Sequence, residues 1–236
     1  MICPSPTGAL RAGPAAAAPP ASLLTGGLNA GRDRLTRLKA RTPKPGEASF
    51  FFYEAHFRSD AVKILPGEYF VFDEDLLIMT TLGSCIAVCL WDRNAHIGGM
   101  NHFMLPDAGD PADGGRFGAF AMELLINELL KMGASRMTLE AKVFGGGAVL
   151  SGMNSLNVGE RNTTFVMDYL KTERIPVVSK DVLDIYPRKV CFFPHSGKAM
   201  VKRLAPSNPE ALVAQERAAL QKPIVSGTAA GSVDLF

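Results

Sequence analysis

Short apolar segments separated by turn residues run through the middle of the chain and predict β-strands. The segment 61–72, AVKILPGEYFVF, divides at a Pro66–Gly67 turn into two extended pieces. The segment 76–92, LLIMTTLGSCIAVCLWD, holds two apolar strands interrupted by a small polar run. The segment 96–106 is a further extended stretch, which Pro106 ends. We therefore expect several strands in succession here.

Helical spacing replaces this pattern further along. After a polar loop expected at 107–116, apolar residues recur as on one helix face, at positions 117, 120, 121, 124, 125 and 129. Gly133 is a suitable helix end. A second helix is predicted over 161–173, and a third from Asn208–Pro209, where a capping residue precedes proline. The remaining strands are expected over 136–147, near 177–178, and as a hairpin over 188–204.

Many strands with two or three helices, and no regular βαβ alternation, favour a layered α+β fold. Hydrophobic residues make up 47% and charged residues 20% of the 236 positions, as in globular proteins. No apolar run approaches the ~20 residues that cross a bilayer, so we expect no membrane insertion. The expected organisation is a disordered Ala/Pro/Gly-rich basic arm over 1–46, one domain over 47–205, and a C-terminal helix with a mobile tail over 206–236.

The net charge of +2 conceals an uneven distribution. Residues 1–46 contain seven Lys and Arg against one acidic residue, Asp33, whereas the remainder holds eighteen basic and twenty-two acidic residues. The arm cannot bury enough apolar surface to offset its chain entropy, so we expect it to be solvated. Because the folded part has no basic excess, we expect no nucleic-acid partner.

Four cysteines, Cys3, Cys85, Cys89 and Cys191, are few for a disulfide framework. Prolines and glycines interrupt each N-terminal apolar run that an export signal would need, so reduced thiols in the cytoplasm are expected. Cys89 and Cys191 have apolar neighbours that favour core packing. Cys85 differs, because small residues stand immediately before it.

A cysteine nucleophile needs an accessible position, a neighbouring base and room for substrate, because only the thiolate attacks well and apolar burial keeps a thiol protonated. Gly83 permits unusual dihedrals or a close approach, and Ser84 is small. LGSC therefore predicts a turn that exposes Cys85 at the head of a strand. Backbone N–H groups of such a turn can stabilise an oxyanion.

His102 is the candidate base. It follows Cys85 by 17 residues, on what is predicted to be the next strand, and two adjacent strands can bring an imidazole within reach of a thiol. A third polar group usually orients such a histidine, and Thr80 and Thr81 precede the turn. Neighbours on a strand face opposite ways, so only one of these threonines can serve.

Other interpretations use the same residues. A lone cysteine entering an apolar strand is usually an inert core residue. Cys85, Cys89, His96 and His102 have the spacing C-x3-C-x6-H-x5-H, which lies within the range of zinc sites. FGGG at 144–147 lacks the Gly-Lys-Ser/Thr of a phosphate loop, so it predicts a glycine turn. Arg161 and Asn162 in GERN either bind substrate or start a helix.

Five segments make the chain resemble CheD-type chemoreceptor glutamine deamidases. TTLGSCIAVCLWD, GGMNHFMLP, EAKVFGGGAVL, NVGERN and RKVCFFPHSGKAMVKRL occur in the order found in that family, with LPGEYF upstream. The resemblance covers residues 60–204, and the pairing of LGSC with GGMNHFMLP is specific. One departure is DVLDIYP at 181–187, where many relatives carry a glycine-rich stretch.

The resemblance implies hydrolysis of glutamine side chains on methyl-accepting chemotaxis receptors to glutamate and ammonia, as part of chemotaxis adaptation. By motif position it makes Cys85 the nucleophile, His102 the general base and acid, and Thr80, with Thr81 in reserve, the third member. It further implies a thioester intermediate, no metal or organic cofactor, and a layered α/β sandwich similar to toxin-type cysteine deamidases. A CheC-type phosphatase is a further implied partner, and without catalysis the same fold would act as a binding module.

Overall fold

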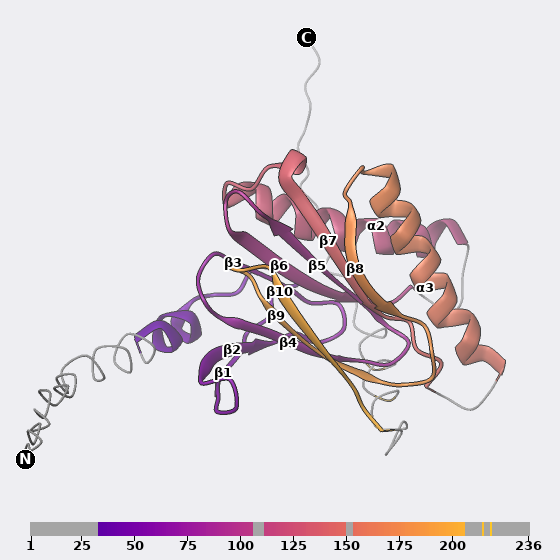
Figure 1. Cartoon of the computed structure of the whole chain (residues 1–236), viewed down its shortest axis with the longest axis horizontal. Helices are drawn as coiled ribbons and strands as arrows, with labels where there is room; N and C mark the ends of the chain where they lie inside the picture. The colour runs from indigo at the N-terminus through magenta and orange to yellow at the C-terminus, as the bar shows by residue number, and fades with distance from the viewer. Residues whose placement is uncertain (1–32, 106–110, 150–152, 206–213, 215–217, 219–236) are drawn as a thin grey trace, which may run out of the picture.

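A computed structural model describes residues 33–105, 111–149 and 153–205, together with positions 214 and 218 (Figure 1). Residues 33–40 form a helix ahead of the strands. The strands are β1 (Phe50–Glu54), β2 (Ser59–Lys63), β3 (Tyr69–Phe72), β4 (Leu77–Leu82), β5 (Ile86–Asp92), β6 (Ile97–Phe103), β7 (Leu139–Gly145), β8 (Val177–Val182), β9 (Arg188–Phe193) and β10 (Lys198–Arg203). The other helices are α2 (Pro111–Lys131), the short 3-10 helix η1 (Arg136–Thr138) and α3 (Met153–Thr172).

The strands form two five-stranded mixed sheets. The first sheet has the order β1-β2-β4-β9-β10, and the second has the order β3-β6-β5-β7-β8. Pairing is parallel between β2 and β4 and between β7 and β8, and antiparallel elsewhere. Because β4 belongs to the first sheet and β5 to the second, the chain crosses between the sheets through residues 83–85. We call this segment the crossover.

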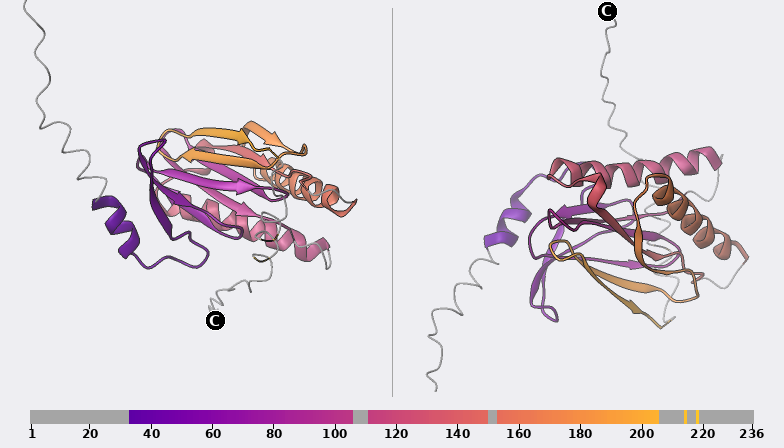
Figure 2. Two further views of the ribbon diagram at one scale, coloured as in Figure 1. Left: turned by 90° about the horizontal axis from the view of Figure 1, so that it is seen from below. Right: turned by 45° about the horizontal axis from the view of Figure 1, so that its top comes forward.

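Alternation along the inner strands divides their side chains between two cores. On β5, Ile86, Val88 and Leu90 join the core between the second sheet and the helices, whereas Ala87 and Cys89 join the core between the two sheets. The helices α2 and α3 cover the outer face of the second sheet, and β9 and β10 lie on the opposite side of the molecule (Figures 1 and 2). The molecule therefore has three layers, namely sheet, sheet and helices.

The α+β fold class predicted from the sequence is confirmed. The strands lie close to their predicted positions, but both helices begin earlier than expected. α2 starts at Pro111, inside the predicted loop, and α3 starts at Met153 rather than near residue 161. Proline suits the first turn of a helix, and the periodic apolar residues of α2 begin only at Phe117, so periodicity missed the first turns. The helix expected from Asn208 lies outside the described residues.

Residues 33–46 pack against the domain, although the sequence analysis placed them in a disordered arm. Leu38 is buried in the core between the sheets. Arg34 forms an ion pair of 2.7 Å with the buried Asp60, and Lys44 contacts Glu128. The Ala/Pro/Gly-rich composition of residues 1–46 as a whole masked the amphipathic helix at 33–40. Across the described part of the chain, no helix has the length and apolar character needed to span a membrane.

Candidate active site

Three segments from both sheets meet at the predicted site. Thr80 lies on β4 of the first sheet, and His102 lies on β6 of the second. Cys85 ends the crossover that joins β4 to β5. All three side chains are buried. The site is thus built into the core between the sheets rather than on a surface loop.

Cys85 and His102 point to the same side of the second sheet. Ala87 pairs with His102 in the ladder between β5 and β6. Cys85 precedes Ala87 by two positions, and both contribute to the core between the sheets, as expected for side chains that share a face. Cys85 and His102 are therefore diagonal neighbours across an antiparallel pair, a separation that long side chains can span.

Thr80 fixes the tautomer of His102. The Oγ1 atom of Thr80 lies 2.9 Å from the carbonyl oxygen of Ile64 and 2.8 Å from Nδ1 of His102. A hydroxyl group has one hydrogen and a carbonyl oxygen can only accept, so Thr80 donates to Ile64 and accepts from His102. The neutral imidazole therefore carries its hydrogen on Nδ1, and Nε2 holds the basic lone pair.

The Nε2 atom of His102 is buried. Within the described ranges it is the buried side-chain polar atom that lacks a hydrogen-bond partner. Burial lowers the pKa of His102 to about 3, while the Ile64 carbonyl acts in the opposite direction. The ring is consequently neutral near pH 7, and Nε2 carries a lone pair rather than a proton.

Cys85 is fully buried, with 0% of its surface exposed, so the expectation of a solvent-exposed thiol is wrong. The reason is the direction of the crossover, which turns the Cys85 side chain between the sheets. Met104, Phe144 and Val158 belong to the same core. Gly83 and Ser84, the small residues before Cys85, instead accept hydrogen bonds at their carbonyl groups.

The crossover is held by a hydrogen bond to each of its three carbonyl groups. The N–H of Gly147 donates to the carbonyl of Gly83, and the N–H of Gly146 donates to the carbonyl of Cys85. The Nδ2 of Asn162 donates to the carbonyl of Ser84, and each of the three bonds is 2.8 Å long. The N–H of a trans peptide points away from the carbonyl of the same unit. The N–H groups of Ser84 and Cys85 are therefore turned away from the glycine loop and α3.

The donor loop requires glycine because its neighbours leave no room for a side chain. Gly145 has a φ of 114°, and a Cβ atom there would lie 2.1 Å from the carbonyl oxygen of Cys85. Gly146 has a φ of 66°, and a Cβ atom would lie 2.3 Å from Oγ1 of Thr163. FGGG is a glycine turn that packs on the crossover, in agreement with the sequence analysis.

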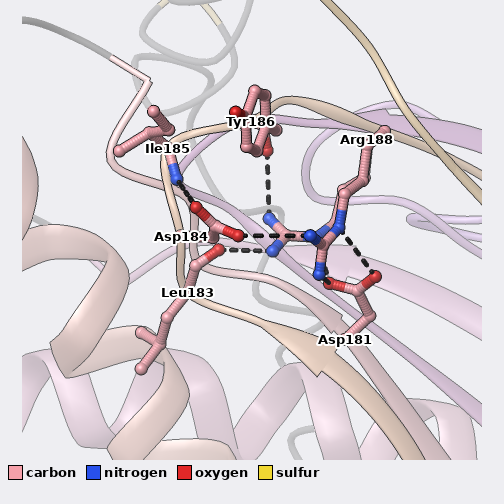
Figure 3. A network of polar contacts seen from close by, with 7 residues as sticks. Asp181, Leu183, Asp184, Ile185, Tyr186 and Arg188 are labelled. Carbon is pink, nitrogen blue, oxygen red and sulfur yellow. Dashed lines mark hydrogen bonds and ion pairs between the residues drawn. The ribbon is translucent and has the colours of Figure 1, made fainter.

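A buried arginine organises the loop that follows β8 (Figure 3). The Nε atom of Arg188 donates to Asp181 at 2.8 Å, Nη1 donates to the Tyr186 carbonyl at 3.0 Å, and Nη2 donates to the Leu183 carbonyl. Leu183 and Asp184 have φ values of 64° and 71°, a region that glycine enters more easily than other residues. Arg188 thus supports a conformation that a glycine-rich loop would adopt without strain.

This loop is bonded in turn to the glycine turn. The N–H of Leu183 donates to the Gly145 carbonyl at 2.8 Å, and the N–H of Ala148 donates to the Asp184 carbonyl at 2.7 Å. The order of contacts runs from Arg188 through the loop and the glycine turn to the crossover. A continuous series of hydrogen-bonded segments therefore supports the backbone of Cys85.

The four residues of the zinc interpretation do not converge. His96 lies in the turn between β5 and β6, where it packs against Trp91 and His195. Six strand positions separate it from His102, about 20 Å at the usual rise per residue. Cys89 is buried on the strand, and burial raises its pKa. No group of three or more His, Cys, Asp or Glu side chains in the described ranges is arranged to hold a metal ion.

Thr81 and Arg161 do not join the site. Thr81 pairs with Lys189 on β9 and faces away from His102, as the neighbour of Thr80 must. Arg161 is exposed. Asn162 is fully buried in the middle of α3, so the helix-start interpretation of GERN is wrong. Its contact with the crossover was missed, because helix periodicity carries no signal for a bond to a distant loop.

The chain is similar to bacterial proteins that share one name. A family model described as CheD chemotactic sensory transduction matches residues 104–203. A protein of Albidiferax ferrireducens, named probable chemoreceptor glutamine deamidase CheD 1, is 64% identical over 204 residues, covering 86% of this chain and 87% of that protein. A Janthinobacterium protein, named probable chemoreceptor glutamine deamidase CheD, is 52% identical over 194 residues, covering 80% of this chain and 95% of that protein.

Likeness to solved structures is slight. The crystal structure of the Bacillus licheniformis hypothetical protein YfiH matches 50% of this chain and 49% of its own, with a TM-score of 0.32 and 14% identity.

Proposed function

The chain belongs to the CheD family of chemoreceptor glutamine deamidases, and on that premise we propose that it hydrolyses glutamine side chains of chemotaxis receptors to glutamate and ammonia. Such a reaction changes the charge of the receptor and contributes to chemotaxis adaptation. One observation carries the proposal for this chain. The basic Nε2 of His102 has no hydrogen-bond partner in the described ranges and lies on the same sheet face as Cys85.

In the first half of the proposed reaction, the thiol of Cys85 is acylated. Nε2 of His102 accepts the thiol proton while Sγ attacks the carboxamide carbon of the glutamine. The tetrahedral intermediate collapses as the C–N bond breaks, and the imidazolium returns its proton to the departing nitrogen, which leaves as ammonia. The product is a thioester between Cys85 and the glutamyl side chain.

In the second half, water hydrolyses the thioester. His102 takes a proton from water, whose oxygen attacks the thioester carbon, and the C–S bond breaks. The sulfur regains the proton from the imidazolium, and the glutamate side chain leaves. The sum is carboxamide plus water to carboxylic acid plus ammonia, without any redox change.

Thr80 and the crossover have supporting roles in this proposal. Thr80 holds the imidazole in the tautomer that leaves Nε2 basic. The N–H groups of Ser84 and Cys85 stabilise the oxyanion, an effect of about 3 kcal/mol or more for a well-placed donor. The three fixed carbonyl groups support this role, because they hold the peptide planes in one orientation.

Substrate entry requires a movement beside Cys85, because the thiol is buried. Continuing the β5–β6 register past the pair Ile86–Phe103 puts Met104 opposite Cys85. The Met104 sulfur also lies 3.5 Å from Oγ of Ser84. Methionine is flexible and unbranched, so we expect its side chain to rotate aside when the carboxamide enters.

The decisive experiment compares Cys85→Ala with the wild type on a soluble receptor fragment. Ammonia release and conversion of glutamine to glutamate, followed by mass spectrometry, measure the reaction. We expect Cys85→Ala to lower kcat by about 10³-fold or more, as loss of a nucleophile does. Cys89→Ala is the matched control, because Cys89 is buried on the same strand face, and it retains activity.

Two outcomes contradict the proposal in different ways. Wild-type protein that deamidates no receptor fragment rules out the activity and favours a binding module. Equal rates for wild type and Cys85→Ala rule out the thiol mechanism while leaving the activity. A CheC-type phosphatase is the further partner that we propose from family membership, and co-purification of the two proteins tests it.

A further inference from the structure

Asn162 is a polar side chain that is wholly buried and hydrogen-bonded at both ends of its amide. It lies on α3 with 0% of its surface exposed. Its Oδ1 accepts the N–H of Leu105 at 2.9 Å, and its Nδ2 donates to the carbonyl of Ser84 at 2.8 Å. Burying an amide is costly unless both ends are bonded. Here each end is bonded to a segment that carries a proposed catalytic residue.

The two partners lie next to the nucleophile and the base. Ser84 immediately precedes Cys85, and its carbonyl belongs to the peptide whose N–H is that of Cys85. Leu105 follows β6 by two positions and stands three residues after His102. The carboxamide of Asn162 therefore joins the end of the crossover to the end of the strand that holds the imidazole. The β5–β6 ladder pairs residues only from Ile86–Phe103 onward, so this bridge lies beyond the last strand pair.

α3 itself is fixed close to this point. Gly159 packs so closely on the glycine turn that a Cβ atom would lie 2.3 Å from the Gly146 carbonyl oxygen. The hydroxyl of Thr163 donates to the Gly159 carbonyl at 2.8 Å, within the helix. Asn162 thus projects from a helix face that packs tightly against the turn, and it is anchored well enough to set the position of the crossover.

We propose that Asn162 is a positioning residue that sets the approach of the Cys85 sulfur to Nε2 of His102. The inference rests on the proposed function. Asn162 touches neither the sulfur nor the imidazole in any contact described above, and it acts through the Ser84–Cys85 peptide and the Leu105 N–H. Misplacement of a reacting group by about 1 Å can cost about 100-fold in rate. We therefore expect loss of Asn162 to lower kcat.

The test replaces Asn162 with leucine, which has a similar size and removes both hydrogen bonds. We expect Asn162→Leu to remain folded and to lower kcat on a receptor fragment by about 100-fold, with KM changed less than about 3-fold. Thr172→Val is the matched control, because Thr172 lies on the same helix, its hydroxyl donates to the Asp168 carbonyl at 2.9 Å, and the change is also isosteric. It loses a bond within the helix and keeps kcat.

A second measurement separates positioning from loss of stability. Slow alkylation of Cys85 by a small reagent, which depends on transient opening of the site, is followed by peptide mass spectrometry with and without His102→Ala, in the wild type and in Asn162→Leu. In the wild type, removing the imidazole slows alkylation. In Asn162→Leu, the same removal changes the rate by a factor near one, because the sulfur and the imidazole are no longer coupled.

The proposal is overturned if Asn162→Leu keeps kcat within about 3-fold of the wild type, or if His102→Ala slows alkylation equally in both backgrounds. Should Asn162→Leu fail to fold, Asn162→Asp undergoes the same two measurements, since it keeps the acceptor for Leu105 and loses the amide donor to Ser84. Wild-type protein without deamidase activity contradicts the proposed function instead, and the alkylation experiment still decides whether Asn162 couples the two groups.

Discussion

Thr80 has one hydroxyl hydrogen, and the contacts around it direct that hydrogen to the Ile64 carbonyl. The imidazole of His102 must then supply the hydrogen of the second contact. This local arrangement selects the nitrogen that is basic. The sequence indicated both threonines, and strand alternation limited the choice to one of them. It did not indicate the Ile64 carbonyl, because a backbone atom just past the end of a neighbouring strand leaves no trace in residue types.

Thr80 and Thr81 form a natural pair for mutation. We predict that Thr80→Val lowers kcat by about 10- to 100-fold, because the imidazole loses the acceptor that orients it. Thr81→Val, one position along the same strand and facing away from the site, retains activity. Kinetics on a receptor fragment measure both variants. Equal losses in the two would refute the assignment of Thr80, and Thr80→Ser should recover part of the rate.

The buried His102 also makes stability depend on pH. The folded protein holds the pKa of His102 near 3, while the unfolded chain has a value near 6.5. Between these values the unfolded chain binds a proton that the folded protein does not, so stability falls as pH falls below about 6.5. Relative to His102→Gln, we expect the wild type to lose about 2 kcal/mol of unfolding free energy between pH 7.5 and pH 5.

Denaturant unfolding at several pH values tests this expectation. The comparison with His102→Gln cancels the contribution of carboxylates, among them Asp92, Glu128 and Asp181, whose pKa values are also lowered in the folded protein. A constant difference between wild type and variant across that range would mean that the imidazole is not held neutral. A difference that widens in favour of the wild type on acidification would mean that the ring is charged when folded.

Among the elements, the glycine turn after β7 has the tightest contacts with the crossover. Three consecutive glycines predicted a turn here, and alternation and turn residues marked the ends of most strands. The starts of α2 and α3 were predicted too late, because the periodic apolar residues of α2 begin only at Phe117 and the segment GERN at 159–162 was interpreted as a helix start. The sequence pattern did not indicate that the turn supplies donors to the Gly83 and Cys85 carbonyls, since those bonds join segments about sixty residues apart.

Two glycines with similar φ angles separate strain from crowding. Gly133 has a φ of 103°, and a Cβ atom added there would meet open space. Gly145 has a φ of 114°, and a Cβ atom added there would lie 2.1 Å from the carbonyl oxygen of Cys85. We predict that Gly133→Ala costs about 1 kcal/mol of stability and keeps activity. Gly145→Ala costs about 3 kcal/mol or more and lowers kcat, because the crossover must shift.

Thermal or denaturant unfolding together with kinetics on a receptor fragment checks this pair. Similar stability losses would show that the φ angle alone matters and that the crossover accommodates the extra carbon. Full activity in a folded Gly145→Ala protein would contradict the view that the turn fixes Cys85.

At the scale of the whole molecule, the fold class followed from the mixture of strands and helices, but the stacking of the two sheets did not. Alternation shows that a strand has two faces without telling which layer covers each. The thiol was therefore expected in solvent, whereas the first sheet covers it. The same limit applies to residues 33–46, where the low-complexity arm obscured a helix that packs on the domain.

This N-terminal helix is part of the fold. We predict that Leu38→Ala lowers the free energy of unfolding by about 2 kcal/mol or more, because it empties a position in the core between the sheets. Lys39→Ala, which changes an exposed neighbour, has little effect. Denaturant unfolding measures both. Equal stability of the two variants would mean that the domain begins after this helix.

The enclosure of Cys85 has a consequence for survival under oxidants. Peroxide converts thiolates that it can reach to sulfenic and then to irreversible acids, and a sulfur with no exposed surface beside an uncharged ring offers neither access nor a ready anion. We expect the idle protein to resist hydrogen peroxide and to become sensitive only while a receptor holds the site open. Damage would then accumulate with the number of turnovers, whereas waiting time alone would leave the protein intact.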